Sequence, residues 1–567
     1  MTKSSRAPRQ TYNDTMQTAT DEFFNQQNLD GVSPREIEAM LIAATNVAIM
    51  DSNTHAPKAE HYSQIQRLVF SQIARVLIER HHVVRIAPSG KNTERDYDML
   101  AIYIDSGEDE GIFVTSEDQI RQIARLYDRQ LTVNMAREVI MVLREEAPRV
   151  YRCDDPDLVP VDNGLFNYRT KELHPFTPEQ VFLSKARVPY DPMATSPQID
   201  NGDQTYWEVE EWMNTLSDDS EIVELLWQIL GAIVRPGVQW NKSAWFFSEQ
   251  GNNGKGTLCA LMRNLTGSAS YASVAIADFG KDFMLEPLTR ASAIIVDEND
   301  VGGYIDRAAN LKAVITGDVI MINRKHKAPI SYQFKGFMVQ CLNEFPRIKD
   351  RSESFYRRQL FVPFTKTFTG RENRAIKNDY LARPAVLRYV LRRVLELTDD
   401  YWVLSEPAAT QQVLDEYKEF NDPVRSFWEE VEDQFVWDLL PFGFLYDIYK
   451  AWFSRTNPSG SPVGRNAFIT DLLSILNKST TWYCSDKRAK IRSAARMLTP
   501  EPLIAQFQLK DWENANYRGA DPLGKCIPHP QAPNYRGIQR YTAVSGGAVQ
   551  DDDDTSGTEP AERGDQS

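Results

Sequence analysis

Cysteine is scarce in this sequence, and long apolar runs are absent. The 567 residues include five cysteines, at positions 153, 259, 341, 484 and 526. Such an odd, scattered set does not make a disulfide framework or a zinc ribbon, which indicates a reducing compartment. No stretch approaches the roughly 18 apolar residues of a membrane helix, and the polar, basic residues 1–10 lack the apolar core of a secretory signal. We therefore expect a cytoplasmic protein without a membrane partner.

Positive charge is also in short supply overall, but it is concentrated locally. The chain has 64 Lys and Arg against 79 Asp and Glu, a net charge of −15, and the segment from Gln550 onward holds seven acids and one arginine. By contrast, Arg324 to Leu360 holds nine basic residues against three acidic ones, and Lys450 to Arg496 holds nine against two. Basic patches inside an acidic chain are typical of a nucleic-acid footprint, although solvated surface remains an alternative.

Composition and periodicity divide the chain into five segments. Residues 1–60 read as flexible or helical, and residues 61–235 as an α/β and helical domain. Between 236 and 400, apolar strands alternate with helices, which predicts a parallel α/β sheet. Residues 405–500 mix helices with a run rich in Trp and Tyr, and residues 501–567 are rich in loops and end in an acidic tail that we expect to be disordered.

A phosphate-binding turn is predicted where an apolar strand meets a helix. The turn consists of Gly251, Asn252, Asn253 and Gly254, and it is followed by Lys255, Gly256 and Thr257. Glycines let successive N–H groups point at one anion, the helix start adds its positive dipole end, and a lysine reaches the outer phosphates. The turn departs from the strict G-x-x-x-x-G-K-[ST] pattern, because Glu249 replaces the first glycine and Gly256 stands where a hydroxyl normally binds Mg²⁺.

Two further apolar strands end in polar residues. Asp297 and Glu298 follow Ala293 to Val296, and Asn343 follows Phe337 to Leu342. Ligands bind at the carboxyl ends of such strands in open α/β sheets. We expect Asp297 to hold Mg²⁺, Glu298 to activate water, and Asn343 to sense the terminal phosphate.

Two basic segments complete the pattern. Arg357 and Arg358 precede another strand, where an arginine presented to a neighbouring subunit could neutralise a transferring phosphoryl group. Two β-like runs flank a basic tip, which predicts a hairpin whose cations grip a single strand of nucleic acid. The residues of that tip are Arg324, Lys325, His326 and Lys327.

Read together, these motifs resemble those of superfamily 3 helicases. Within that superfamily, the similarity is to the phage and plasmid primase–helicases, which are related to the poxvirus primase–helicase. The matching pieces are Gly251 to Thr257, Asp297 with Glu298, Leu311 to Pro329, Asn343 with Pro346, Arg357 with Arg358 and, upstream, Asp162 to Leu165 and Tyr190 to Pro192. The similarity covers about residues 150–400.

The resemblance implies an α/β fold with an AAA+ P-loop ATPase core, a helical N-terminal region and a C-terminal winged-helix domain over about 405–500. It implies a homohexameric ring that encircles single-stranded DNA at a replication fork and moves 3′ to 5′. ATP would lie between subunits with Mg²⁺, and a phage-encoded chain would work in the cytoplasm of a bacterial host beside a primase or polymerase partner.

The resemblance also implies roles for individual residues. Lys255, with the turn Gly251 to Thr257, would bind the phosphates, and Asp297 with Thr257 would hold Mg²⁺. Glu298 would be the base, Asn343 the sensor, and Arg357 or Arg358 the finger acting in trans. Lys325 and Lys327 would lie on the pore loop, with Arg324 and His326 beside them.

Three alternatives stay open. A primase needs paired carboxylates, and Asp96 with Asp98 is a D-x-D candidate without a strong apolar strand before it. A replication initiator or scaffold would bind ATP with weak turnover, which Gly256 keeps plausible. An AAA+ motor for DNA packaging would use the same basic hairpin.

Overall fold

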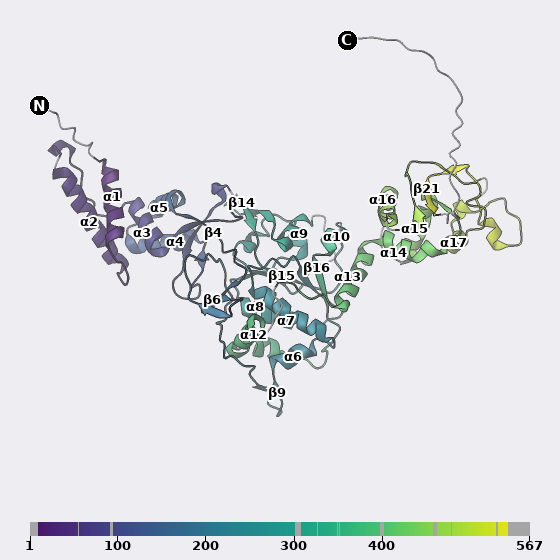
Figure 1. Cartoon of the computed structure of the whole chain (residues 1–567), viewed down its shortest axis with the longest axis horizontal. Helices are drawn as coiled ribbons and strands as arrows, with labels where there is room; N and C mark the ends of the chain where they lie inside the picture. The colour runs from purple at the N-terminus through teal and green to yellow at the C-terminus, as the bar shows by residue number, and fades with distance from the viewer. Residues whose placement is uncertain are drawn as a thin grey trace, which may run out of the picture. The chain divides into compact units, whose positions relative to one another are not determined.

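The chain forms two compact units, which are described separately. The computed structural model describes residues 10–54, 56–90, 94–300, 308–325, 327–348, 350, 352–396, 402–456, 462–477, 479–528 and 531–541. The first unit runs from Met1 to Asn421 and the second from Asp422 to Ser567 (Figure 1). No helix among the described residues is long and apolar enough to span a bilayer.

The N-terminal part of the first unit is built from capped helices around a small sheet. Helices α1 (Tyr12–Gln26) and α2 (Pro34–Thr54) pack against each other, and α3 (Phe70–His81), α4 (Glu117–Tyr127) and α5 (Val133–Glu146) follow. Their sheet has the order β3-β2-β1-β4, with bounds Phe113–Val114, Met99–Tyr103, Val84–Ala87 and Arg149–Tyr151. The polar stretch before residue 30 is thus helical over Tyr12–Gln26, because a capping box of Thr11 and Asp14 begins α1 and Phe23 is buried.

One asparagine links two parts of the segment that leads to the large sheet. Strands β5 (Leu158–Val161), β6 (Gly164–Asn167) and β7 (Glu172–His174) form an antiparallel sheet. In the turn between β5 and β6, the Asn163 side chain donates to Tyr190 O at 2.9 Å and accepts from Tyr190 N at 2.8 Å. The two upstream motifs, Asp162 to Leu165 and Tyr190 to Pro192, therefore meet in space. Helices α6 (Val209–Thr215) and α7 (Ser220–Val234) follow, beyond the short hairpin of β8 (Ile199–Asp200) and β9 (Tyr206–Trp207).

The predicted parallel sheet is present and lies at the centre of the first unit. Its order is β11-β12-β15-β10-β16, and every neighbouring pair is parallel. The bounds are Tyr271–Ala272, Ala293–Val296, Phe337–Leu342, Ser243–Phe247 and Gln359–Pro363. Because all five strands run in one direction, the polar residues that follow β10, β12 and β15 come to the same edge.

Both faces of this sheet are covered, which is why its strands are mostly apolar. Ala244, Phe246 and Val339 face one cluster with helices α7, α8 (Lys255–Thr266) and α12 (Pro384–Glu396). Trp245 and Met338, which alternate with them, face the other cluster. That second cluster includes residues of α9 (Ala309–Thr316), α13 (Ala408–Asn421) and the hairpin β13–β14.

The helical stretch around residues 374–397 and the basic hairpin both follow from their local sequence. Helical periodicity runs from about 374 to 397 in the sequence. The structure divides this stretch into α11 (Arg374–Asn378), a 3-10 turn and α12, because the ring of Pro384 fits only the first turn of a helix. The hairpin is confirmed: β13 (Val319–Arg324) pairs antiparallel with β14 (Lys327–Gln333), with a register shift between Ile322 and Arg324.

The second unit is a helical layer against a three-stranded antiparallel sheet. Helices α14 (Pro423–Val431), α15 (Phe442–Thr456) and α16 (Arg465–Leu476) pack with the sheet β17-β21-β18. Its strands are Leu439–Pro441, Gly537–Arg540 and Trp482–Tyr483. Tyr449, Trp452 and Phe453 are buried, so these aromatics form core. Since β21 lies between β17 and β18, residues after 500 complete this sheet and do not all belong to a loop-rich tail.

Candidate functional site

The predicted phosphate turn lies between the central strand β10 and helix α8. Asn252 has φ 53° and Gly254 has φ 91°, both in the left-handed region. The positive φ of Gly254 favours glycine, and a β-carbon there would stand 2.7 Å from Leu216 Cδ2, so that side chain would have to move. Gly254 is the N-cap of α8, and Asn253 Oδ1 accepts from Lys255 N at 3.2 Å. The turn therefore presents the start of a twelve-residue helix, where an anion is favoured.

Lys255 is buried and joins three acceptors at the edge of the sheet. Its Nζ donates to Ser248 O at 3.1 Å, to Leu342 O at 2.9 Å and to Asn343 Oδ1 at 2.8 Å. Burial lowers the pKa of Lys255 from its ordinary value. The ammonium thus links the end of β10 to the end of β15, and it brings the predicted phosphate ligand and the predicted sensor into direct contact.

Asp297 and Glu298 follow β12 at the same edge, with different surroundings. Asp297 is half-buried, with Arg263 Nη1 at 3.8 Å and Lys377 Nζ at 3.9 Å from Oδ2, whereas Glu298 is exposed. Both cations lie close enough to pair with Asp297, and carboxylate oxygens are ligands suited to a hard cation such as Mg²⁺. Thr257, whose hydroxyl could be a second oxygen ligand, lies in the first turn of α8.

The glycine that breaks the expected motif has a structural reason. A β-carbon on Gly256 would lie 2.9 Å from Asp297 Oδ1 and 3.1 Å from Oδ2. The carboxylate therefore occupies the space that a serine or threonine side chain would need. The sequence shows the departure, but only the fold shows that Asp297 is what fills the space.

Sequence reasoning missed the residue that fixes the loop after Asp297. Asn299 Nδ2 donates to Gln340 Oε1 and to Cys341 O, both at 3.0 Å, and Asn299 Oδ1 accepts from Ile276 N at 3.0 Å. Gln340 in turn donates to Val274 O at 3.0 Å. An asparagine three residues past a strand is too common in turns for the sequence to reveal this role.

Two hollows flank the turn. One, of about 310 Å³, has aromatic walls and reaches the turn at Asn252, Gly254 and Thr257. Its apolar side chains include Trp207, Trp212, Phe368 and Ile376. The other, of about 780 Å³, is lined by Glu249, Asn343 and Arg347 together with aromatic rings. None of these aromatic residues was predicted from the sequence, because they come from separate segments that only folding brings together.

The two candidate arginines are not equivalent. Arg357 is exposed, and its side chain makes no hydrogen bond or ion pair with the residues that the structure describes. Arg358 is half-buried and folds back onto α10 (Glu353–Tyr356), where Nη1 donates to Ser354 O and, at 2.7 Å, to Ser354 Oγ. Of the two, Arg357 is the one that can reach another molecule.

The basic hairpin tip is only partly free. Lys325 and Lys327 are exposed, whereas Arg324 donates from Nε and Nη2 to Ala328 O at 3.0 and 2.9 Å. Arg324 thus braces the tip, and the two lysines present the charge. His326 lies outside the described residues. In the second unit, Lys487, Arg488, Lys490 and Arg492 are all exposed between β18 and β19 (Ile491–Arg492) or within β19.

The carboxylate pair considered for a primase is not assembled as a metal site. Asp98 is buried and paired with Arg149, which donates from Nε and Nη2 at 2.9 to 3.1 Å. Asp96 is exposed on the adjoining turn. A carboxylate held by a forked guanidinium is already satisfied and serves the fold.

Three family models match this chain. One is described as a family of unknown function and matches residues 246–358, which run from the end of β10 to Arg358. The others are a D5 N terminal like model over residues 117–215 and a poxvirus D5 protein-like model over residues 419–514. The models thus match before, within and after the region of the parallel sheet.

Solved structures of the NrS-1 C-terminal region are also similar. One apo form is 12% identical, with a TM-score of 0.40, and covers 76% of this chain and 98% of that one. Two other apo structures of that region are 14% identical with the same coverage and TM-scores of 0.40 and 0.39. The two D5-named models match on both sides of the sheet, so the chain is similar to D5-like proteins over those two segments.

Proposed function

We propose that this chain is an ATP-dependent DNA helicase or translocase of superfamily 3, with an AAA+ P-loop core, acting in replication of a phage or mobile element. The observation that carries the proposal is the convergence at one sheet edge. Lys255 contacts Asn343 at 2.8 Å at the helix start where a triphosphate would bind, and Asp297 stands against Gly256 in the same helix turn.

In this proposal the phosphates take the place of the present acceptors of Lys255. Backbone N–H groups of the turn and the helix start bind the phosphate oxygens, and the Lys255 ammonium moves to contact the same phosphates. Asp297 and Thr257 would hold Mg²⁺, which would supply positive charge next to the phosphates. Glu298, exposed beside Asp297, orients and deprotonates the attacking water. Asn343 then loses its hydrogen bond from Lys255 and forms one to the terminal phosphate or to the attacking water.

In this proposal, the base of the nucleotide lies in the aromatic hollow. It adjoins the turn, and its walls of Trp207, Trp212 and Phe368 suit the flat faces of a base. The exposed Arg357 completes the site of a neighbouring subunit in a homohexameric ring. Lys325 and Lys327 line the channel of that ring and hold the phosphates of single-stranded DNA, along which the ring moves 3′ to 5′. The second unit, with a winged-helix arrangement and its exposed cations at 487–492, contacts duplex at the fork.

The test is nucleotide hydrolysis measured with and without single-stranded DNA, together with unwinding of partial duplexes that carry a 3′ or a 5′ tail. We expect DNA-stimulated hydrolysis and unwinding that needs the 3′ tail. Lys255→Met, which keeps the apolar stem and removes the ammonium, should abolish hydrolysis. Melting curves are needed beside it, because Lys255 also joins β10 to β15.

The outcomes separate the alternatives. Nucleotide binding without turnover would overturn the helicase in favour of an initiator or scaffold, and primer synthesis with Mg²⁺ or Mn²⁺ would favour a primase. Duplex DNA as the sole stimulant would favour a packaging motor. The engaged state of Asp98 speaks against the primase.

A further inference from the structure

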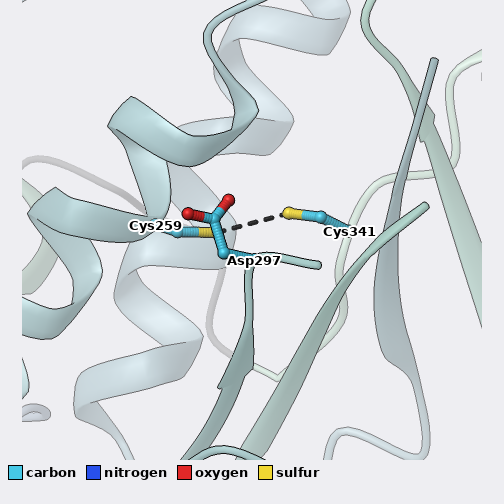
Figure 2. A group of neighbouring side chains, drawn as sticks. All are labelled: Cys259, Asp297 and Cys341. Atoms are coloured by element: carbon cyan, nitrogen blue, oxygen red, sulfur yellow. Dashed lines mark hydrogen bonds between the residues drawn. The ribbon is translucent and has the colours of Figure 1, made fainter. Parts of the chain in front are cut away.

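Two cysteines and the aspartate of the candidate site gather beneath the phosphate turn. Cys259 comes from α8, Cys341 from β15 and Asp297 from the end of β12, as Figure 2 shows. The two Sγ atoms lie 3.4 Å apart, and the ligand atoms of all three residues lie within 4.8 Å of one another. Within the described ranges, no other group of three His, Cys, Asp or Glu side chains brings its ligand atoms together in this way.

These distances suit one metal ion with soft ligands. Zinc binds thiolates at about 2.3 Å and carboxylates at about 2.1 Å in tetrahedral geometry, so two thiolate ligands stand ~3.8 Å apart. The observed sulfur separation of 3.4 Å needs only a small outward shift. Magnesium prefers oxygen ligands and would leave both sulfurs unused, so ligand softness separates the two metals.

Charge and access also fit a cation at this point. Two thiolates and a carboxylate carry one negative charge more than Zn²⁺ neutralises, and Arg263 and Lys377 lie 3.8 and 3.9 Å from Asp297 to balance it. Cys259 and Cys341 are buried, whereas the Asp297 side chain is 29% exposed. An ion therefore enters past the carboxylate and meets the sulfurs behind it.

We propose that Cys259, Cys341 and Asp297 form a binding site for Zn²⁺. On binding, each thiol gives its proton to solvent, so one Zn²⁺ releases two protons, and the fourth coordination position stays open to water. The consequence for activity rests on the proposed function: Zn²⁺ draws Asp297 into its own coordination, deprives Mg²⁺ of that ligand, and stops nucleotide turnover.

The binding test uses Co²⁺ as a spectroscopic substitute for zinc in the full chain. A variant with Cys153→Ser, Cys484→Ser and Cys526→Ala retains the pair alone. It should give thiolate-to-cobalt charge-transfer absorption and tetrahedral d–d bands that saturate at one ion per chain, and Zn²⁺ should displace them. The matched variant, Cys259→Ala with Cys341→Ala and the other three cysteines intact, should lose those bands.

Absence of the bands from the first variant, or their persistence in the second, would overturn the site. If the double alanine variant does not fold, Asp297→Asn serves instead, because it removes one ligand and leaves both sulfurs. It should weaken Co²⁺ binding at least tenfold, and unchanged binding would overturn the three-residue site. Proton release into weak buffer, two per Zn²⁺, is the independent measure of both thiols.

Turnover is the second arm of the test. Stoichiometric Zn²⁺ should inhibit hydrolysis by the wild-type chain, a chelator should restore it, and the Cys259→Ala, Cys341→Ala variant should be insensitive relative to its own rate without zinc. Cobalt bands without inhibition would overturn the link to turnover. Absence of hydrolysis in zinc-free buffer that contains Mg²⁺ would count against the proposed function, while the cobalt bands would still decide the zinc site.

Discussion

The Asp297 carboxylate stands where a side chain at Gly256 would have to be, with Oδ1 2.9 Å from the position of a β-carbon. The first turn of α8 and the end of β12 are therefore fitted to each other at this pair. A residue type that breaks the usual phosphate-loop pattern is the one that lets the acid approach the helix start.

Replacing Gly256 should reveal this contact as a coupling between two positions. Gly256→Ala should destabilise the chain by about 1–3 kcal/mol, because the added methyl overpacks against Asp297. In an Asp297→Ala background the same change should stabilise the chain by up to ~1 kcal/mol, since alanine favours a helix over glycine. Thermal or denaturant unfolding of the four proteins measures the sign reversal, and equal effects in both backgrounds would contradict it.

Arg357 and Arg358 should differ in what their loss affects. Arg357→Ala should reduce hydrolysis by ~10³-fold without shifting the melting temperature, because the exposed guanidinium serves a neighbouring site. Arg358→Ala should instead destabilise the chain by about 1–2 kcal/mol, because it removes the bonds to Ser354. Mixing Arg357→Ala with Lys255→Met chains should restore some hydrolysis at interfaces that pair the intact residues. No recovery in the mixture would argue against a site shared between subunits.

Lys325 and Lys327 should contribute to the salt dependence of DNA binding. Replacing both with alanine should weaken binding to single-stranded DNA and reduce the slope of log affinity against log salt by about 1.4, at ~0.7 per phosphate contact. Lys58→Ala with Arg129→Ala removes the same charge from exposed positions elsewhere and is the matched control. Equal slopes for the two double variants would show that the hairpin tip has no special role.

His81 should make the N-terminal helices sensitive to acid. Burial, followed by the charge of Arg80, lowers the pKa of His81 from 6.5 to about 4, and its Nε2 lies 2.8 Å from the Tyr127 hydroxyl. The unfolded chain takes up a proton below pH 6.5 while the folded chain does not, so stability falls between pH 6.5 and about 4, by up to roughly 3 kcal/mol. His81→Gln should flatten this loss in unfolding measured at pH 7 and pH 5. His82→Asn, at an exposed neighbouring position, should not.

Much of the fold could be predicted from the hydrophobic periodicity of the sequence and from the polar residues that end its strands. The hairpin around residues 319–333 and the strand ends at Asp297 and Asn343 are predicted by local pattern, because apolar β-branched runs and turn residues determine both. Contacts between residues far apart in the sequence could not be predicted. Nothing local links Trp207 to Phe368, or Cys259 to Cys341, and the break at Pro384 is subtle because the helical periodicity continues on both sides.

The three hydrogen-bond acceptors of Lys255 influence which anions can bind at this site. An incoming anion must replace two backbone carbonyls and an amide that already satisfy the ammonium. The binding of a small monovalent ion such as chloride stabilises the lysine less than those three hydrogen bonds do. A polyphosphate, by contrast, contacts the helix start and the lysine at the same time. Under the proposed function, these contacts therefore favour multivalent anions over the abundant monovalent ones.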